Sequence, residues 1–318
     1  MNLSEFQTLA DDIRGEIGSV VQGQKPLINM LLTSVFARGH CLLEGPPGTA
    51  KTLLARCLAQ VVDLEFGRVQ FTPDLMPGDV LGVNLFNFET HAFHLTKGPV
   101  FTDILLADEI NRAPPKTQAA LLQAMNEREV TIDGVTYALG QDFFVIATQN
   151  PIEQHGTYPL PEAQLDRFLF KILVDFPDRE AEVDILKRSA GLPLDADSGR
   201  KELRKVMSRD ALRAGHALVD SIRLDETILR YIVDLVRATR NDSEILHGAS
   251  TRAANAIAGA VRAKAALDGR DYAIPDDVQA LLIPALRHRV VLGPAAEIEG
   301  RTSDDVLQTI MNRTDAPR

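Results

Sequence analysis

The chain has 318 residues, which is enough for two domains and a sizeable core. Hydrophobic residues make up 45% of the chain and charged residues 25%, a balance typical of globular proteins. The formal net charge of −10 argues against a general nucleic-acid binder, which usually carries a basic face. No apolar run approaches the roughly 20 residues that span a bilayer. The start, MNLSEFQTLADDIR, lacks the apolar core of a signal peptide, so we expect a cytoplasmic protein.

The first residues predict two helices. Ser4 and Gln7 have the spacing of a capping box, and apolar residues then recur at helical spacing as far as Ile17. Residues 20–24 interrupt this pattern. A second helix follows, with an apolar face that extends to Val35.

Residues 40–52, HCLLEGPPGTAKT, place an apolar strand, a glycine-containing turn and the start of a helix in succession. Loop amides and a helix N-terminus would face one anion in this arrangement, so it predicts a phosphate-binding loop. Lys51 would reach the β- and γ-phosphates of a nucleotide, and Thr52 would place its hydroxyl on Mg²⁺. The strict pattern G-x-x-x-x-G-K-[ST] has glycine where this chain has Ala50. An ordinary turn between a strand and a helix is the alternative.

Further apolar strands are predicted at residues 66–71, 103–107 and 143–148, and a last strand begins at Phe168. Strands that alternate with helices indicate a parallel sheet with helices on both faces. Ligands bind such sheets at the carboxyl ends of the strands. Four polar residues follow strand ends and are therefore expected at one site: Lys51, Asp108, Glu109 and Asn150.

Two hairpins are predicted between these strands. Residues 83–95 have the pattern of a hairpin-like insert, and we expect its aromatic residues to form a packing face rather than a partner surface. These aromatic residues are Phe86, Phe88 and Phe93. In the second hairpin, over residues 130–139, Asp133 and Gly134 are typical of a two-residue turn.

After Phe176 the pattern becomes helical, and no strand run or glycine-rich loop is evident. Helices are predicted at residues 178–189, 208–220, 225–239, 250–267 and 275–283. We therefore divide the chain into an α/β nucleotide-binding domain, residues 1–176, and an all-helical domain, residues 177–318.

Hydrolysis of a nucleotide requires a carboxylate that holds the metal ion and a group that positions the attacking water. Asp108 would hold hydrated Mg²⁺ beside Thr52, and Glu109 would polarise the water. Asn150 is a candidate to orient that water or to sense the γ-phosphate, with an Asn-Pro turn as the alternative. Arg167 is too distant in the chain to be assigned to its own nucleotide. A neighbouring subunit's site is its candidate target, with a surface ion pair as the alternative.

Four segments resemble the MoxR family of AAA+ ATPases: GPPGTAKT, LLADEINRAPPKTQAALLQAM, FFVIATQNPIEQHGTYPLPEAQLDRF and GASTRA. The resemblance covers nearly the whole chain. It implies an ATPase that uses ATP and Mg²⁺, with an AAA+ P-loop NTPase parallel-sheet domain followed by an all-helical lid domain. The family's loop commonly tolerates alanine before the lysine, so Ala50 fits the family.

The resemblance also implies roles for individual residues. The nucleotide-binding residues are Gly45, Pro46, Pro47, Gly48, Thr49, Ala50, Lys51, Thr52 and Leu53, and the metal-binding residues are Thr52 and Asp108. The catalytic residues are Lys51, Glu109 of Walker B, Asn150 at sensor 1, Arg167 as the arginine finger and Arg252 at sensor 2. Arg252 would touch the γ-phosphate in cis. Arg112 is a second basic candidate near a subunit boundary, and Thr251 stands where the family usually has proline.

The family resemblance further implies a homo-oligomeric ring, expected to be a hexamer, in which Arg167 acts in trans and both hairpins face the pore. It suggests chaperone-like maturation or activation of client proteins, with a partner that contains a von Willebrand factor A domain. The sequence does not identify the client. Three alternatives stay open: the ATPase subunit of a metal-chelatase-like machine, a nucleic-acid motor, and a non-hydrolysing nucleotide-gated scaffold. The acidic charge disfavours the nucleic-acid motor, and the complete catalytic set disfavours the scaffold.

Overall fold

The computed structural model describes residues 1–151, 156–189 and 203–317. Residues 152–155, which fall within the third MoxR-like segment, lie outside the described residues. Within the described part of the chain, no helix is both long and apolar enough to cross a membrane.

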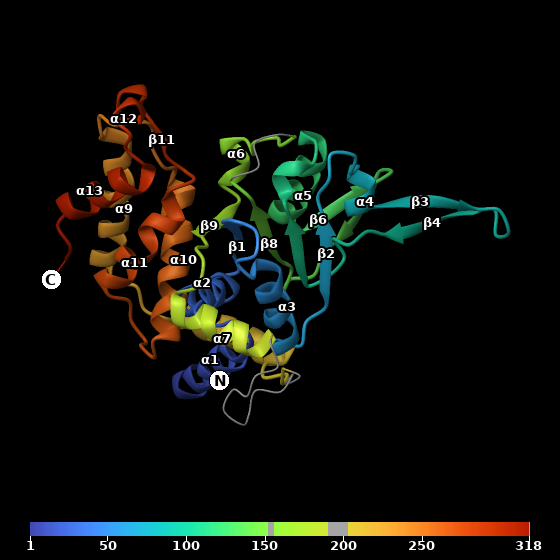
Figure 1. The fold of residues 1–318 in the computed structure, drawn as a ribbon, viewed down its shortest axis with the longest axis horizontal. Helices are drawn as coiled ribbons and strands as arrows, with labels where there is room; N and C mark the ends of the chain where they lie inside the picture. Colours follow the sequence, from blue (N-terminus) through green and yellow to red (C-terminus); the bar gives the residue numbers. More distant parts are fainter. Residues whose placement is uncertain (152–155, 190–202, 318) are drawn as a thin grey trace.

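A five-stranded parallel sheet lies at the centre of the molecule, as predicted (Figure 1). Its strands are β1 (His40–Glu44), β2 (Phe66–Gln70), β5 (Ile104–Asp108), β8 (Phe144–Gln149) and β9 (Phe168–Leu173). Their order is β2-β5-β8-β1-β9. From β1 the chain passes to β2 at one edge of the sheet and returns through β5 and β8. It then crosses to β9, on the other side of β1. This topological switch point is where open parallel sheets bind ligands.

Apolar residues cover both faces of the sheet. On one face, Leu43 and Leu106 share a core with helices α1 (Leu3–Val20), α2 (Lys25–Phe36) and α3 (Lys51–Val61). On the other face, Leu42 and Leu105 share a core with α4 (Pro77–Leu81) and α5 (Pro115–Glu127). Neighbouring residues of a strand point to opposite faces, so these continuous apolar runs specify strands that are buried on both sides.

Helix α1 begins earlier than predicted, because its cap is different. The side chain of Asn2 accepts from the backbone N–H of Glu5, and the Glu5 carboxylate accepts from the N–H of Asn2, both at 2.9 Å. The capping box therefore consists of Asn2 and Glu5, and the predicted box of Ser4 and Gln7 was wrong. Asparagine caps a helix as well as serine does, and this box starts the helix two residues sooner.

The first hairpin, β3 (Gly82–Asn87) and β4 (Ala92–Lys97), projects away from the rest of the molecule (Figure 1). Phe86 lies 5.2 Å, between ring centroids, from each of Phe88 and Phe93. Phe88 is nevertheless 82% exposed and Phe93 70%. The expected packing face was therefore wrong, because the aromatic side chains contact one another on a ribbon that has no core beneath it.

The second hairpin has the predicted turn. Strands β6 (Glu129–Ile132) and β7 (Val135–Ala138) pair on either side of Asp133 and Gly134. Both turn residues have positive φ, 48° and 79°, as a type I′ turn requires.

The rest of the described chain is mainly helical, as predicted, and we call its helical part beyond β9 the lid. Its helices are α7 (Arg179–Ser189), α8 (Arg209–Ser221), α9 (Glu226–Asn241), α10 (Thr251–Leu267), α11 (Pro275–Leu286), α12 (Pro294–Ile298) and α13 (Ser303–Arg313). A short antiparallel pair, β10 (Ile245–His247) and β11 (Val291–Leu292), was not predicted. Strands this short are below the length at which an alternating pattern can be recognised. The domain boundary at residue 176 stays a prediction. Helix α2, before this boundary, and helices α8 and α10, after it, contribute to one continuous core.

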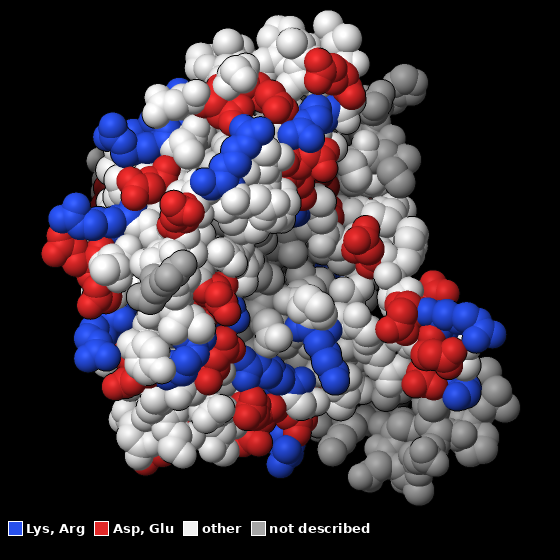
Figure 2. Space-filling model, turned by 90° about the vertical axis from the view of Figure 1, so that its left-hand side faces the viewer, with Lys and Arg blue, Asp and Glu red and all other residues white. Residues whose placement is uncertain are grey.

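The lid end of the molecule carries charges of both signs. Figure 2 shows this face, where Lys and Arg side chains lie interspersed with Asp and Glu side chains. No large patch of one sign is visible among the described residues on this face.

Candidate active site

The phosphate loop connects β1 to α3. Gly45 is required there, because a Cβ at this position would lie 2.2 Å from the backbone oxygen of Val174. Gly48 has φ of 86°, and Ala50 has φ of 61°. The left-handed conformation of Ala50 explains why the strict pattern has glycine at this position. A residue with a side chain costs about 1–2 kcal/mol in that conformation. No side chain caps α3, so its first N–H groups can bind an anion.

Lys51 is held against this loop. Its Nζ donates to the backbone oxygens of Gly45 and Pro46, at 2.8 and 2.6 Å, and to Thr49 Oγ1 at 3.1 Å. Burial lowers the pKa of Lys51, while the charges of Asp108 and Glu109 raise it. The Lys51 ammonium group therefore lies against the loop. Phosphate oxygens can replace the loop oxygens that accept its hydrogen bonds in this structure.

Asp108 ends β5 and is held by three side chains. Its Oδ1 accepts from the Thr148 hydroxyl at 2.7 Å, and its Oδ2 accepts from Arg68 Nη2 at 2.7 Å and from the Thr52 hydroxyl at 3.3 Å. The Thr52 hydroxyl and the Asp108 carboxylate are adjacent hard oxygen donors, the kind that Mg²⁺ takes together with water. These two residues therefore fit a Mg²⁺ ion, as expected from the sequence.

Glu109, the next residue, has a left-handed backbone with φ of 56° and ψ of 50°. This conformation is uncommon for a residue with a side chain and is concentrated at functional sites. Its N–H donates to the Thr148 hydroxyl at 2.8 Å. Its Oε2 accepts from Gln70 Nε2 at 2.9 Å and from Arg112 Nη1 at 3.1 Å. The sharp turn directs the two acidic side chains differently, so that Asp108 faces Thr52 and Glu109 faces Gln70.

These groups line one cavity of about 430 Å³, within the usual size range of ligand sites. Its lining residues are Pro47, Gly48, Thr49, Ala50, Lys51, Thr52, Leu53, Arg68, Gln70, Asp108, Glu109, Thr148, Gln149 and Asn150. The structure thus brings together most of the residues expected at the nucleotide. Gly45 and Pro46 are not in the lining, and their carbonyl groups instead hold Lys51.

Three residues of the cavity were not predicted from the sequence: Arg68, Gln70 and Thr148. Arg68 and Gln70 alternate with buried Val69 along β2, so their side chains emerge on the same face of the sheet. This alternation was a usable signal. Thr148 gave no such signal, because it lies inside an apolar strand. Its contacts with Asp108 and Glu109 depend on the pairing of β5 with β8.

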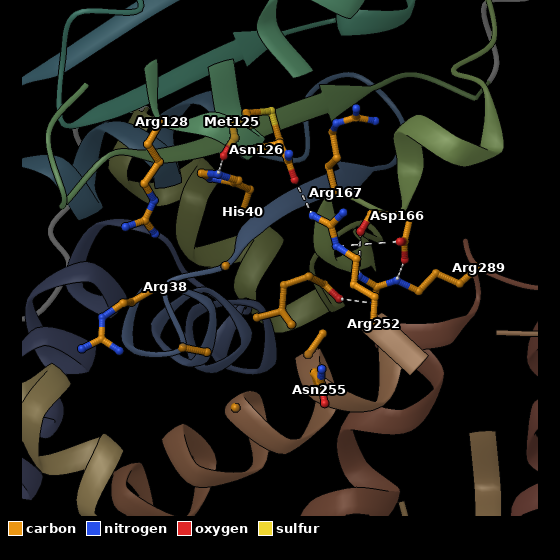
Figure 3. Close-up of a pocket in the computed structure, with 15 residues that line it drawn as sticks. Arg38, His40, Met125, Asn126, Arg128, Asp166, Arg167, Arg252, Asn255 and Arg289 are labelled. Atoms are coloured by element: carbon orange, nitrogen blue, oxygen red, sulfur yellow. Dashed lines mark hydrogen bonds and ion pairs between the residues drawn. The ribbon is translucent and has the colours of Figure 1, made fainter. Parts of the chain in front are cut away.

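Arg167 and Arg252 lie elsewhere. They line a second cavity of about 290 Å³ that also contains Asp166, Arg289 and Asn126 (Figure 3). Arg252 Nη2 donates to Asn126 Oδ1 at 2.6 Å, and its Nε lies 3.9 Å from Asp166 Oδ2. The expected cis contact of Arg252 with the γ-phosphate is therefore not what the structure shows. The reason is the lid, whose helix α10 packs on α2 and starts beside the end of α5.

The fold and the cavity define the class of protein. A phosphate loop lies at the switch point of a parallel sheet, a lysine and a threonine begin the following helix, and an Asp-Glu pair ends a nearby strand. These are the parts of a P-loop nucleoside triphosphatase.

Comparisons with known proteins narrow this class. Residues 40–170 match the model of the ATPase family associated with various cellular activities (AAA), and residues 237–310 match the AAA lid domain. The protein named Chaperone MoxR1 of Mycobacterium tuberculosis is 40% identical over 95% of this chain and 81% of its own. Protein MoxR of Paracoccus denitrificans is 33% identical over 93% of this chain and 92% of its own.

A crystal structure from Cytophaga hutchinsonii, of a protein proposed to be an ATPase, has a TM-score of 0.90. It is 39% identical and covers 99% of this chain and 97% of its own. The chain belongs to the MoxR family of AAA+ ATPases.

Proposed function

We propose that the protein works as a homo-oligomeric ring, a hexamer, that hydrolyses ATP with Mg²⁺ at its subunit boundaries. One observation carries this proposal: the arginines expected at the γ-phosphate, Arg167 and Arg252, line a cavity other than the one that contains Lys51. Phosphoryl transfer requires positive charge around the transferred group. Each chain would therefore supply a phosphate loop to one site and two arginines to the next subunit's site.

Within one site, the residues take separate roles. The loop amides and Lys51 would bind the phosphates, and Thr52 and Asp108 would hold Mg²⁺, which neutralises charge on the phosphate oxygens. Glu109 would accept a proton from the attacking water, and Asn150 would orient that water. Gln70 and Arg112 both donate to Oε2 of Glu109 in this structure, so Oε1 is the oxygen that would meet the water.

The output of hydrolysis is proposed to be chaperone-like action on client proteins in the cytoplasm. The name of the mycobacterial relative supports a chaperone role. The exposed aromatic side chains of the β3–β4 ribbon support contact with another protein, because large exposed apolar groups mark interaction sites. A partner with a von Willebrand factor A domain is proposed from the family resemblance alone.

A nucleic-acid motor is disfavoured by the net charge of −10. The mixed charges on the lid face also argue against it, since nucleic-acid binding needs a basic stripe (Figure 2).

Mixed rings test the proposal. Arg167→Ala should remove an arginine finger, whose contribution is roughly 10³–10⁵ in rate, and Glu109→Gln should remove the base. Either variant alone should be nearly inactive in a steady-state ATPase assay. In an equal mixture, the phosphate loop of an Arg167→Ala subunit can meet the finger of a Glu109→Gln subunit. Random assembly of a head-to-tail ring then completes roughly a quarter of the sites.

A mixture of Lys51→Ala with Glu109→Gln is the control, because both subunits then lack a working phosphate-loop site and no recovery is expected. Native mass spectrometry would verify co-assembly. Absence of recovery in co-assembled Arg167→Ala and Glu109→Gln rings would contradict action in trans.

A further inference from the structure

Among the lid side chains that contact the segment around Arg167, Arg289 makes the largest set of hydrogen bonds given by the described residues. Arg289 follows α11, and its side chain is only 4% exposed. Its guanidinium makes five hydrogen bonds, and four of them are to residues 166–169. The residue that bears the expected finger is therefore flanked on both sides by acceptors of a single buried cation.

The individual bonds show how the fork is used. Nε donates to Asp166 Oδ1 at 2.7 Å, Nη2 to the backbone oxygens of Asp166 and Phe168 at 3.1 and 2.7 Å, and Nη1 to the oxygen of Leu169 at 3.1 Å. Nη1 also donates to the oxygen of Ala285, in the preceding helix α11, at 2.6 Å. A planar guanidinium can meet this set of acceptors at once, whereas a lysine ammonium cannot span them.

The start of β9 lies at the edge of the sheet, where its backbone oxygens accept hydrogen bonds from outside the sheet. Among the described residues, strand β9 lies at the edge of the sheet and pairs with β1 alone. The register of that pair shifts at its start, where His40 faces Phe168. The oxygens of Phe168 and Leu169 are taken by the lid instead, with His288 Nε2 also 2.9 Å from the Phe168 oxygen. The start of β9, directly after Arg167, is thus fastened to the lid.

Charge also favours this arrangement. Burial lowers the pKa of Arg289, and the Asp166 carboxylate raises it again by its charge and its hydrogen bond. The same carboxylate lies between Arg289 and Arg252, which comes from α10 (Figure 3). Two lid helices therefore meet the residue that precedes Arg167.

From these contacts we propose that Arg289 is a positioning residue that couples the lid to the arginine finger, so that a movement of the lid moves Arg167 at the neighbouring site. The inference rests on the proposed ring. Arg289 does not line the cavity around Lys51, and four of its five hydrogen bonds are to residues 166–169, so we assign its effect on turnover to that segment.

Arg289→Lys tests the inference, because it keeps the charge and loses the fork. We expect kcat to fall by about 10²-fold, the typical effect of a catalytic group displaced by about 1 Å. Affinity for a fluorescent ATP analogue should stay unchanged. An equal mixture with Glu109→Gln should restore turnover, as it does for Arg167→Ala, whereas a mixture with Arg167→Ala should not, because neither subunit then offers a positioned finger.

Arg287→Lys is the matched control. Arg287 lies two residues earlier and is largely buried, but its Nη2 donates to Asp304 Oδ2 at 2.7 Å within the lid. Turnover of this variant should equal that of the wild type.

Hydrogen exchange supplies a readout that does not depend on activity. In Arg289→Lys the amides of residues 168–170 should exchange faster, while the amides of residues 45–52 should be unchanged. Faster exchange throughout the lid would indicate a general structural role and would overturn the inference. If Arg289→Lys does not fold, Asp166→Asn weakens the same anchor while keeping an acceptor oxygen. That variant should show a smaller loss of kcat, also restored by Glu109→Gln.

Two failures can be told apart. The inference is overturned, and the ring proposal stands, if Arg289→Lys has wild-type kcat or is not restored under conditions that restore Arg167→Ala. If Arg167→Ala is itself not restored, the action of the finger in trans fails, and the inference fails with it.

Discussion

Thr148 joins the two acidic residues at the end of β5 through one hydroxyl. It donates to Asp108 Oδ1 and accepts from the N–H of Glu109. Thr148 is only 1% exposed, so water cannot replace either hydrogen bond. A neutral side chain that touches no substrate in our proposal thus orients the Asp108 carboxylate and fixes the backbone turn at Glu109.

Thr148→Val should therefore reduce both stability and turnover. The substitution keeps the shape but leaves a buried acceptor and a buried donor unsatisfied, which costs about 1–3 kcal/mol. We expect the free energy of unfolding in urea to fall by this amount, and kcat to fall about tenfold, the equivalent of 1.36 kcal/mol. Thr148→Ser keeps the hydroxyl and should retain most of the activity. Wild-type kcat in Thr148→Val would show that the hydroxyl does not orient the acids.

At the scale of elements, His40 connects three of them. It starts β1, its Nδ1 accepts from the N–H of Val145 in β8 at 3.0 Å, and its Nε2 donates to the oxygen of Met125 in α5 at 3.1 Å. Burial lowers the pKa of His40 to about 4. The neutral imidazole is therefore the form that the folded protein requires.

Stability should consequently depend on pH through His40. Between pH 6.5 and 4 the unfolded chain binds a proton that the folded chain does not, so the free energy of unfolding rises with pH in this window. The contribution is fully present above pH 6.5 and is lost toward pH 4, by up to about 1.4 kcal/mol per pH unit. In urea titrations, His40→Gln should be less stable at pH 7 but lose less stability on acidification. Curves for the two proteins should run parallel above pH 7, and an equal loss below pH 6.5 would exclude the role of His40.

The elements themselves follow from local patterns. Alternating apolar strands and helices, and the Asp133-Gly134 turn, were recognisable because each depends on neighbours in the chain. The position of the β3–β4 ribbon was not recognisable. Its aromatic residues have the pattern of a packed face, and only the three-dimensional fold shows that nothing covers them.

At the scale of the whole molecule, charged contacts join the lid to the sheet in addition to the shared hydrophobic core. Arg209, at the start of α8, forms a fork with Asp103 at 2.9 and 2.5 Å and also contacts Asp142 at 3.3 Å. Both acids are buried and precede β5 and β8, at the opposite end of the sheet from Asp108. The lid is therefore attached at the amino ends of these strands as well as at β9.

Arg209→Ala should destabilise the whole protein. It leaves Asp103 buried without its cation, and breaking a buried pair in this way costs about 3–5 kcal/mol. We expect the lower end of this range, because the Arg209 side chain is 39% exposed. Arg230→Ala is the control: its pair with Glu226 is 73% exposed on both sides, so the change should stay within about 0.5 kcal/mol. Urea denaturation at pH 7 would measure both, and similar values for the two variants would contradict the assignment.

By itself, the sequence determined the parallel sheet, the phosphate loop and the acidic pair at the end of β5. Each strand, the loop and the acidic pair is encoded by a contiguous run of residues, and the alternation of strands with helices indicates the parallel sheet. The tertiary structure alone decided that Arg68, Gln70 and Thr148 complete the cavity, and that Arg167 and Arg252 share a different one. Those contacts join residues far apart in the chain, so they depend on the strand order β2-β5-β8-β1-β9 and on where the lid packs. The lid docks through Arg289 and Arg209, whose partners no local pattern specifies.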